Sequence, residues 1–358
     1  MKCNKRLKCL FFAVASFILF TGCTMEDIAK KNGKDNGVTT KIFAMNTVMN
    51  MTIYGESIES AKKILAEAEQ EIYQLEALFS ATMKNSDISY INENAGKSPV
   101  KVSEQTITMI EKAKEIQKLT NGAFDITVSP VVKAWGFTTR NFRVPKKEEI
   151  TKLISYINSD WITINKEEQT VFLEKPGMAI DLGGIAKGYT ADYLSNWFEQ
   201  KGVASGILSL GGNVIGIGLH NGNKWGVALQ DPLNENASVG ILKIGNQSVV
   251  TSGGYQRNFE KDGKIYHHII NPKTGYPAEE GLISVTIISS DGTKADGLST
   301  ALFVMGIEQA VDFWRQSNDF EAIFITEDRR VLATEGIADD FQFTGESQGY
   351  QYSTIFKK

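Results

Sequence analysis

The chain has 358 residues, a formal net charge of −4 at pH 7 and 42% hydrophobic residues, which is enough for a sizeable core. Its three cysteines are Cys3, Cys9 and Cys23, and the first two lie in a segment that we expect to be removed, so an internal disulfide is excluded. Loss of residues 1–22, with four basic residues and no acidic one, moves the charge to −8 and argues against general nucleic-acid binding.

The first 40 residues have the pattern of a secretion signal followed by a tether. A basic start precedes an apolar run from Leu10 to Phe20, which is shorter than the roughly 20 residues that span a bilayer. The run ends in Thr21-Gly22-Cys23, which resembles the bacterial lipobox, in which the cysteine is lipidated. We therefore expect a lipoprotein signal peptide over 1–22 and a polar tether over 23–40. An ordinary signal peptide with an incidental cysteine is the alternative.

Hydrophobic periodicity in the first half of the remaining chain, 41–358, predicts strands and helices in alternation. A strand pattern extends over 39–54. Apolar residues at helical spacing predict amphipathic helices over 61–78 and 104–120. Residues 122–137 and 161–173 alternate as strands and turns do.

The second half is richer in short β-like runs. These lie between residues 205 and 289 and are separated by Gly and Asn, as antiparallel hairpins require. A helix over 296–305 and 308–316 and closing strands over 322–325 and 331–334 complete the pattern. The mixture predicts an α+β fold in which helices pack on antiparallel sheets.

A glycine-rich segment, Asp181 to Tyr189, lies between the two halves. We expect a strand-like approach over 177–180, a Gly-Gly turn, and then a helix with Ala191, Leu194, Trp197 and Phe198 at helical spacing. Glycines allow the backbone to contact a bound group closely. Free N–H groups at a helix start favour an anion, and Lys187 adds a positive charge. The segment is typical of a phosphate cradle, although many Gly-Gly turns are only tight connections.

Two further segments contain groups suited to chemistry. Asp296 and Thr300 are one helical turn apart, so they offer two hard oxygen ligands that suit Mg²⁺ better than zinc. Helix capping by Asp296 is the alternative. His267 and His268 directly precede a stiff loop that ends at Pro277, and this loop holds the adjacent imidazole in a defined position. A surface or structural role for either histidine is the alternative.

Together, these segments resemble the ApbE family of FAD:protein FMN transferases from about Phe43 to the C-terminus. The resemblance depends on seven ordered motifs: Met45-Asn46-Thr47; Gly122-Ala123-Phe124-Asp125 with Trp135-Gly136-Phe137; Asp181 to Tyr189; Leu210-Gly211-Gly212-Asn213; Thr251-Ser252-Gly253; His268 to Gly275; and Ala295-Asp296 to Thr300. It implies an α+β, T-fold-like architecture of two intimate lobes, with FAD in the cleft between them.

The resemblance also implies a set of binding residues. FAD contacts are expected at Met45, Thr82, Ala123, Phe124, Asp125, Asp181, Gly183, Lys187, Tyr189, His268 and Ile270. Mg²⁺ is expected on the Ala186 carbonyl, Asp296 and Thr300, next to the diphosphate. His268 would steady the flavin or the diphosphate, or assist proton transfer.

The implied reaction transfers FMN from FAD to a threonine or serine hydroxyl of a target protein and releases AMP. The implied acceptors are flavin-carrying subunits of membrane redox complexes. Together with a lipid on Cys23, this predicts an enzyme anchored in the bacterial envelope, on the outer side of the cytoplasmic membrane or at the periplasmic face.

Two positions depart from the family pattern. Thr82 stands where the family commonly has an aromatic residue that stacks on the flavin, and Asn271 replaces an aspartate. Loss of the stacking face would weaken flavin retention or let water compete as nucleophile. FAD hydrolysis to FMN and AMP is therefore an alternative function, and a flavin-binding lipoprotein without turnover is another.

Overall fold

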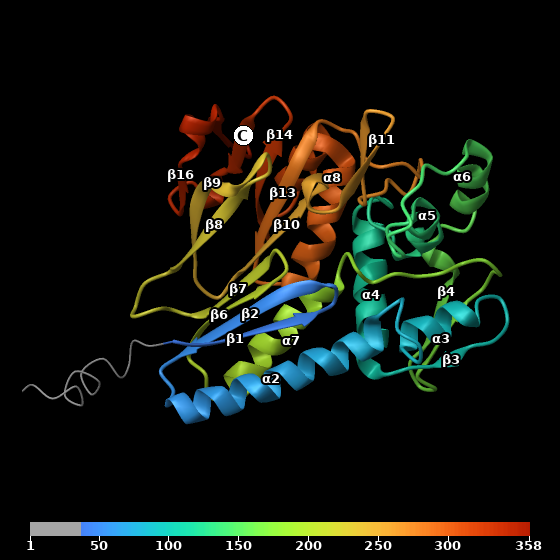
Figure 1. Ribbon diagram of the computed structural model, residues 1–358, viewed down its shortest axis with the longest axis horizontal. Helices are drawn as coiled ribbons and strands as arrows, with labels where there is room; N and C mark the ends of the chain where they lie inside the picture. The colour runs from blue at the N-terminus through green and yellow to red at the C-terminus, as the bar shows by residue number, and fades with distance from the viewer. Residues whose placement is uncertain (1–36) are drawn as a thin grey trace, which may run out of the picture. The chain divides into compact units, whose positions relative to one another are not determined.

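A nine-stranded sheet lies at the centre of the computed structural model, which describes residues 37–358 (Figure 1). Every neighbouring pair is antiparallel except β15 and β17, which are parallel. The strands lie side by side in the order β1 (Val38–Ala44), β2 (Thr47–Tyr54), β6 (Ser205–Leu210), β7 (Asn213–Gly218), β10 (Ser248–Gly253), β13 (Leu282–Ser289), β14 (Glu321–Thr326), β15 (Arg330–Thr334) and β17 (Gln351–Ile355). The predicted α+β fold is confirmed.

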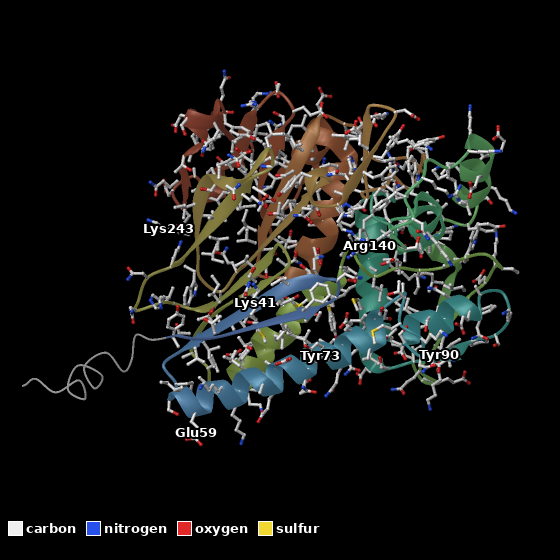
Figure 2. The ribbon with its side chains drawn as sticks, viewed as in Figure 1. Lys41, Glu59, Tyr73, Tyr90, Arg140 and Lys243 are labelled. Carbon is white, nitrogen blue, oxygen red and sulfur yellow. The ribbon has the colours of Figure 1, made fainter. Side chains whose placement is uncertain are left out.

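Three helices cover one face of this sheet: α2 (Ile58–Phe79), α7 (Ala186–Gln200) and α8 (Gly292–Arg315). Side chains alternate along a strand, so only every second residue faces the helices. Val250 of β10 and Ile287 of β13 join the core around α8. The outer face of α2 carries Glu59 and Tyr73, which are exposed (Figure 2).

A three-stranded sheet of β16 (Phe341–Phe343), β9 (Asn234–Ile244) and β8 (Trp225–Asp231) covers the other face. Val249 and Ile288 point this way and pack with Trp225 and Leu242 in a separate core. The central strands are therefore buried on both faces, which explains why their sequences read as continuous apolar runs.

The remaining elements lie mostly beside one end of the sheet (Figure 1). They are α3 (Asp87–Glu93), β3 (Val100–Lys101), α4 (Glu104–Leu119), α5 (Ser129–Trp135), α6 (Lys147–Ile154), β4 (Ile162–Asn165), β5 (Thr170–Leu173) and the hairpin β11 (Asn258–Lys261) and β12 (Lys264–His267). Ile110 of α4 and Leu173 of β5 share a core with α8. The two predicted lobes are thus joined in one compact unit, Gly37 to Lys358.

Several local predictions need correction. Residues 122–137 contain a short 3₁₀ helix and α5, because Pro130 begins a helix that buries Val131 and Trp135. The approach over 177–180 is irregular, with Gly177 in the left-handed region (φ 92°). Val38 pairs with β2, although we assigned it to the tether, and Thr39 and Thr40, where the predicted tether and strand overlap, belong to the strand. The predicted signal, Cys23 and most of the tether lie outside the described residues.

No helix within residues 37–358 is long and apolar enough to cross a membrane. The longest, α8, changes direction at Gly306, whose backbone is non-helical (φ 76°, ψ 170°). A side chain at Gly306 would also meet Glu280, because a Cβ there would lie 2.7 Å from the Cβ of Glu280. The bend therefore requires glycine.

Gly188 of α7 is the point of closest approach to α8. A Cβ on Gly188 would lie 2.2 Å from the carbonyl oxygen of Gly292 and 2.7 Å from the Cβ of Asp296. Backbone cannot move aside as a flexible side chain does, so α7 and α8 approach this closely only with glycine here.

Gly188→Ala should therefore lower the free energy of unfolding by about 1–3 kcal/mol, the usual cost of overpacking a well-packed core. Chemical denaturation measures this. Gly245→Ala is a matched control, because a Cβ there would meet nothing within 4 Å. Equal stability of the two variants would contradict the close helix contact.

Candidate active site

A cavity of about 710 Å³ opens where the turns of two β-hairpins meet the start of α7 and the N-terminal half of α8. Its volume lies in the range of small-molecule and cofactor sites. Thirteen residues that we predicted as site residues line it: Met45, Thr82, Ala123, Phe124, Asp125, Asp181, Gly183, Ala186, Lys187, His268, Ile270, Asp296 and Thr300. Residues far apart in the chain are thus brought together in one place.

Tyr189 is the predicted site residue that does not line this cavity. Its ring packs edge-on against Phe79, with the centroids 5.4 Å apart, and it is partly buried against the core. Burial, together with the charge of Glu104, raises the pKa of its hydroxyl. Tyr189 therefore supports the wall behind the cavity.

The turn between β1 and β2 forms one end of the cavity. Met45 and Asn46 both have positive φ angles (49° and 59°), as the two central residues of a type I′ turn require. This conformation is unusual for methionine. The carboxylate of Glu76 holds the turn in place, because its Oε1 accepts a hydrogen bond from the Met45 backbone N–H at 2.7 Å.

The glycine-rich segment uses part of its hydrogen-bonding capacity internally. The Gly183 N–H donates to Asp181 Oδ1 at 2.7 Å, and the Gly188 N–H donates to Asp296 Oδ2 at 2.8 Å. The prediction that free N–H groups at this helix start hold an anion is therefore corrected at Gly188, whose partner is the protein's own carboxylate. Lys187 lines the cavity and supplies the positive charge of the segment, with its Nζ 3.4 Å from the Gly183 carbonyl oxygen.

Asp296 does not cap α8. The cap is Asp291, whose Oδ1 accepts from the Lys294 N–H at 2.8 Å, whereas Asp296 lies inside the helix. The capping alternative for Asp296 is therefore wrong. Its side chain is only 4% exposed, and Oδ1 lies 3.7 Å from Lys187 Nζ. A buried carboxylate needs such partners, since desolvation disfavours an isolated charge.

A chain of hydroxyl groups fixes the orientation of Thr300. The Ser299 hydroxyl donates its proton to the Asp296 carbonyl at 2.8 Å. Ser299 Oγ can then only accept in its 2.8 Å contact with Ser252, so the Ser252 hydroxyl is the donor there. Each hydroxyl has one proton. The 3.2 Å contact between Thr300 Oγ1 and Ser252 Oγ therefore uses the proton of Thr300. This leaves the lone pairs of Thr300 available to a ligand in the cavity.

His268 is held by the backbone of Arg257. Its Nδ1 lies 3.1 Å from the Arg257 carbonyl oxygen and donates to it, which leaves Nε2 as an acceptor. Burial lowers the pKa of His268 to about 3, and the nearby positive charges of Arg257 and Lys187 contribute. The imidazole is therefore neutral near pH 7. This favours the predicted role of steadying a ligand over that of taking up a proton.

Asp125 has a structural role in the site. Its Oδ1 accepts from the Thr127 N–H at 2.8 Å and from the hydroxyls of Thr127 and Ser159 at 2.6 and 2.7 Å. Three donors leave this oxygen little capacity for a ligand. The carboxylate thus fixes the loop that presents Ala123 and Phe124 to the cavity.

Of the two residues that depart from the family pattern, Thr82 lines the cavity and Asn271 does not. Thr82 is exposed and lines the cavity, where its hydroxyl lies 3.2 Å from Ser80 Oγ. The rim therefore has no aromatic face at this residue. Asn271 faces away, and its Oδ1 accepts from the Lys273 N–H at 2.9 Å within the loop.

Three important residues of the site did not stand out in the sequence. Glu76 is one of several acidic residues of an amphipathic helix, Ser252 lies near the end of β10, and Arg257 is one of 38 basic residues. Arg257 Nη2 donates to the Phe137 carbonyl at 2.9 Å. Of these three residues, only Ser252 could have been identified from the sequence, because it belongs to the motif Thr251-Ser252-Gly253.

The α+β fold with this cavity matches the ApbE family. The sequence model of that family matches residues 45–324, and the chain belongs to the family. A relative from Klebsiella pneumoniae, named FAD:protein FMN transferase, is 36% identical over 79% of this chain and 87% of its own length. A relative of the same name from Treponema pallidum is 33% identical, over 75% and 78%.

Solved structures agree with this assignment. The ApbE protein of Thermotoga maritima has a TM-score of 0.75 and 31% identity, and the match covers 89% of this chain and 100% of that one. The flavin transferase ApbE of Vibrio cholerae has a TM-score of 0.73 and 28% identity, covering 88% and 100%.

The lowered pKa of His268 predicts a pH-dependent stability. In the unfolded chain, His268 takes up a proton near its ordinary pKa of 6.5, whereas the folded chain resists protonation down to about 3. The unfolded state then binds more protons, so stability falls as the pH drops through this window. His268→Gln should reduce the fall in urea midpoint between pH 7 and pH 5.

His267, whose pKa burial also lowers, should maintain part of the fall. Gln200→Ala, at an exposed residue outside the cavity that does not titrate, is the control and should keep the wild-type pH dependence. A fall in His268→Gln as large as that of the wild type would contradict the assigned environment.

Proposed function

We propose that this chain transfers FMN from FAD to a threonine or serine hydroxyl of an acceptor protein and releases AMP. The hydroxyl oxygen forms a bond to the FMN phosphorus, the bond from that phosphorus to the AMP phosphate breaks, and the hydroxyl proton is released. One observation supports this most: a buried carboxylate, Asp296, and an oriented hydroxyl, Thr300, face a glycine-rich loop in a cavity large enough for a nucleotide.

Mg²⁺ is the cation that we propose for this site. The donors are hard oxygens: the Asp296 carboxylate, the Thr300 hydroxyl with free lone pairs, and the Ala186 carbonyl. Within residues 37–358, no group of three His, Cys, Asp or Glu side chains is suited to a metal, so a carbonyl and a hydroxyl must contribute. A bound Mg²⁺ would withdraw charge from the diphosphate oxygens.

The residues of the chain would position the dinucleotide. Lys187 and Arg257 line the cavity and offer positive charge to phosphate oxygens. His268 offers its neutral ring as a hydrogen-bonding contact. The turn at Met45, held by Glu76, closes the end of the cavity.

FAD hydrolysis to FMN and AMP is the second candidate function. The observation that favours it is Thr82, because the cavity rim has no aromatic ring at this position to stack on a flavin. A loosely held flavin gives water more access to the phosphorus.

We also propose that the protein is a lipoprotein of the bacterial envelope, anchored by a lipid on Cys23. The lipobox pattern supports this. An anchored enzyme on the outer side of the cytoplasmic membrane, or at the periplasmic face, would meet flavin-carrying subunits of membrane redox complexes. These are the acceptors that we propose.

The first test is an incubation of the chain without residues 1–22 with FAD, MgCl₂ and a flavin-accepting domain of such a complex. Intact mass should show an acceptor heavier by one FMN, with an equal amount of AMP.

Asp296→Asn should reduce transfer by roughly tenfold to a hundredfold, since it removes charge from the cation site. Free FMN without acceptor modification would support the hydrolase. Unchanged FAD would support a carrier without turnover, and transfer at the wild-type rate by Asp296→Asn would contradict the assigned site.

The second test restores an aromatic ring at the rim. Thr82→Tyr should tighten FAD binding roughly threefold to tenfold, because an aromatic contact contributes about 0.5–1.5 kcal/mol. The share of FAD lost to hydrolysis should fall at the same time. Fluorescence titration and a count of free FMN per modified acceptor measure both. Thr163→Tyr, on β4 outside the cavity, is the control. Unchanged FAD affinity in Thr82→Tyr would rule out a flavin near residue 82.

A further inference from the structure

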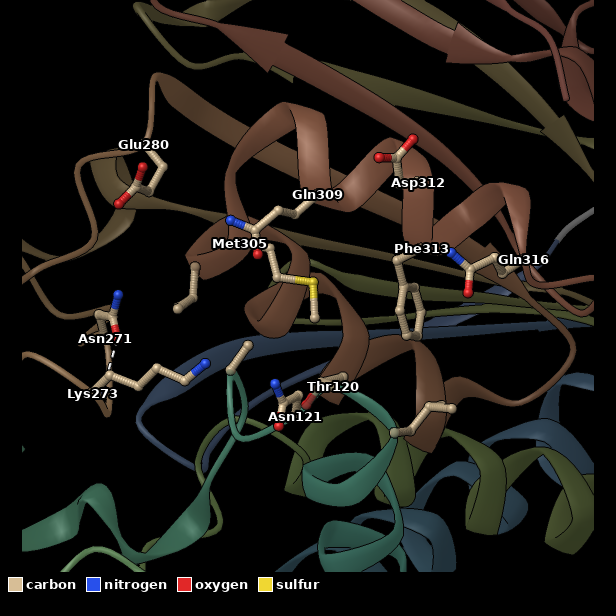
Figure 3. Close-up of a pocket in the computed structure, with 13 residues that line it drawn as sticks. Thr120, Asn121, Asn271, Lys273, Glu280, Met305, Gln309, Asp312, Phe313 and Gln316 are labelled. Carbon is tan, nitrogen blue, oxygen red and sulfur yellow. Dashed lines mark hydrogen bonds between the residues drawn. The ribbon is translucent and has the colours of Figure 1, made fainter. Parts of the chain in front are cut away.

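A second hollow lies beside the cavity, in the bend of α8. We call it the kink pocket. Its volume is about 370 Å³, and its lining residues are Leu119, Thr120, Asn121, Ala123, Asn271, Lys273, Glu280, Val304, Met305, Gln309, Asp312, Phe313 and Gln316 (Figure 3). Nothing in the proposed chemistry uses it.

The bend at Gly306 creates this pocket. Val304 and Met305 precede the bend, while Gln309 and Phe313 follow it, and all four line the same hollow. A straight helix would present one convex stripe here. The non-helical backbone of Gly306 instead turns the second half of α8 to form a wall.

The kink pocket adjoins the nucleotide cavity. Ala123 lines both, and Asn271 and Pro272, neighbours in the chain, line one each. Val304 is one helical turn after Thr300, or about 6 Å along the axis. An extended peptide advances about 3.3 Å per residue. A residue in the kink pocket would therefore lie two to four positions from a residue that reaches the cation site.

The lining suits an uncharged peptide segment. Ala123 and Val304 are buried and form an apolar base. The rim carries amide side chains from Asn121, Gln309 and Gln316, and none of these side chains hydrogen-bonds to another part of the described chain. Amides match the N–H and C=O groups of a peptide backbone.

The charges of the rim argue against an anionic ligand. Lys273 contributes one positive charge and points into the space opposite Met305 (Figure 3). Glu280 and Asp312 are the acids of the rim, and Asp312 is paired with Arg315 at 3.2 Å. The charges are close to balanced, so a second nucleotide or a phosphate gains little here.

We propose that the kink pocket binds the acceptor protein, at a residue two to four positions from the hydroxyl that receives FMN. The occupant is an extended, uncharged segment that places a small or medium apolar side chain on Val304 and its backbone against the rim amides. This inference rests on the proposed transferase function and adds to it the place where the protein substrate docks.

Gln309→Trp tests this by filling the pocket from an exposed position. The probe is a purified FMN-accepting domain of a membrane redox complex, varied in concentration at saturating FAD. The KM for the acceptor should rise at least tenfold, while the FAD dissociation constant and FMN release without acceptor stay within twofold. Gln200→Trp is the matched control, because Gln200 is exposed at the end of α7, outside both hollows.

A second variant guards against misfolding of the first. Lys273→Ala with Gln316→Ala removes two polar groups from the rim and should raise the same KM about threefold to tenfold. An unchanged acceptor KM in both variants overturns the proposal, as does a parallel loss of FAD binding, because the pocket would then serve the dinucleotide. No transfer by the wild type would instead overturn the proposed function.

Discussion

The hydrogen bond from the Gly188 N–H to the Asp296 carboxylate is the contact on which the site depends. It joins the first turn of α7 to the interior of α8 across 108 residues of sequence. The contact requires glycine at position 188, because any Cβ would meet the Gly292 carbonyl. One carboxylate oxygen is thereby fixed, and the other is directed toward Lys187 and the cavity. A single close approach of two helices thus sets both the fold and the orientation of the proposed metal ligand.

The hydroxyl groups near this contact form a chain of hydrogen bonds, and the direction of each bond follows because each hydroxyl has only one proton. Ser299 gives its proton to the Asp296 carbonyl, Ser252 gives its own to Ser299, and Thr300 must then donate to Ser252. Buried networks of this kind fix side chains more strongly than surface contacts do, because an unpaired partner in a low dielectric is costly. The outcome is a hydroxyl whose lone pairs face the cavity without competition from its own proton. Such an oxygen binds a hard cation with little rearrangement.

The sequence predicted those features that depend on local pattern. The helices at 61–78 and 104–120 and the run of hairpins follow from apolar spacing, and the lining residues follow from motifs. Local pattern failed at 122–137, where β-branched residues such as Val131 suggest strands but tertiary burial selects a helix. The internal use of the Gly188 N–H also could not be predicted, because its partner is distant in sequence. The alternative that Asp296 caps the helix was wrong because Asp291 is the N-cap of α8.

The two halves of α8 have different environments, and this difference has a physical cause. Before Gly306 the helix is enclosed by the sheet, α4 and α7, so its polar side chains must pair with one another. After Gly306 the helix bends, and Gln309, Asp312 and Gln316 are exposed. The enclosed polar side chains before Gly306 hold a small ligand with fixed geometry. The exposed side chains after Gly306 adapt to a partner that arrives from solvent. A transferase with a protein substrate needs both, and one bent helix places them on either side of Gly306.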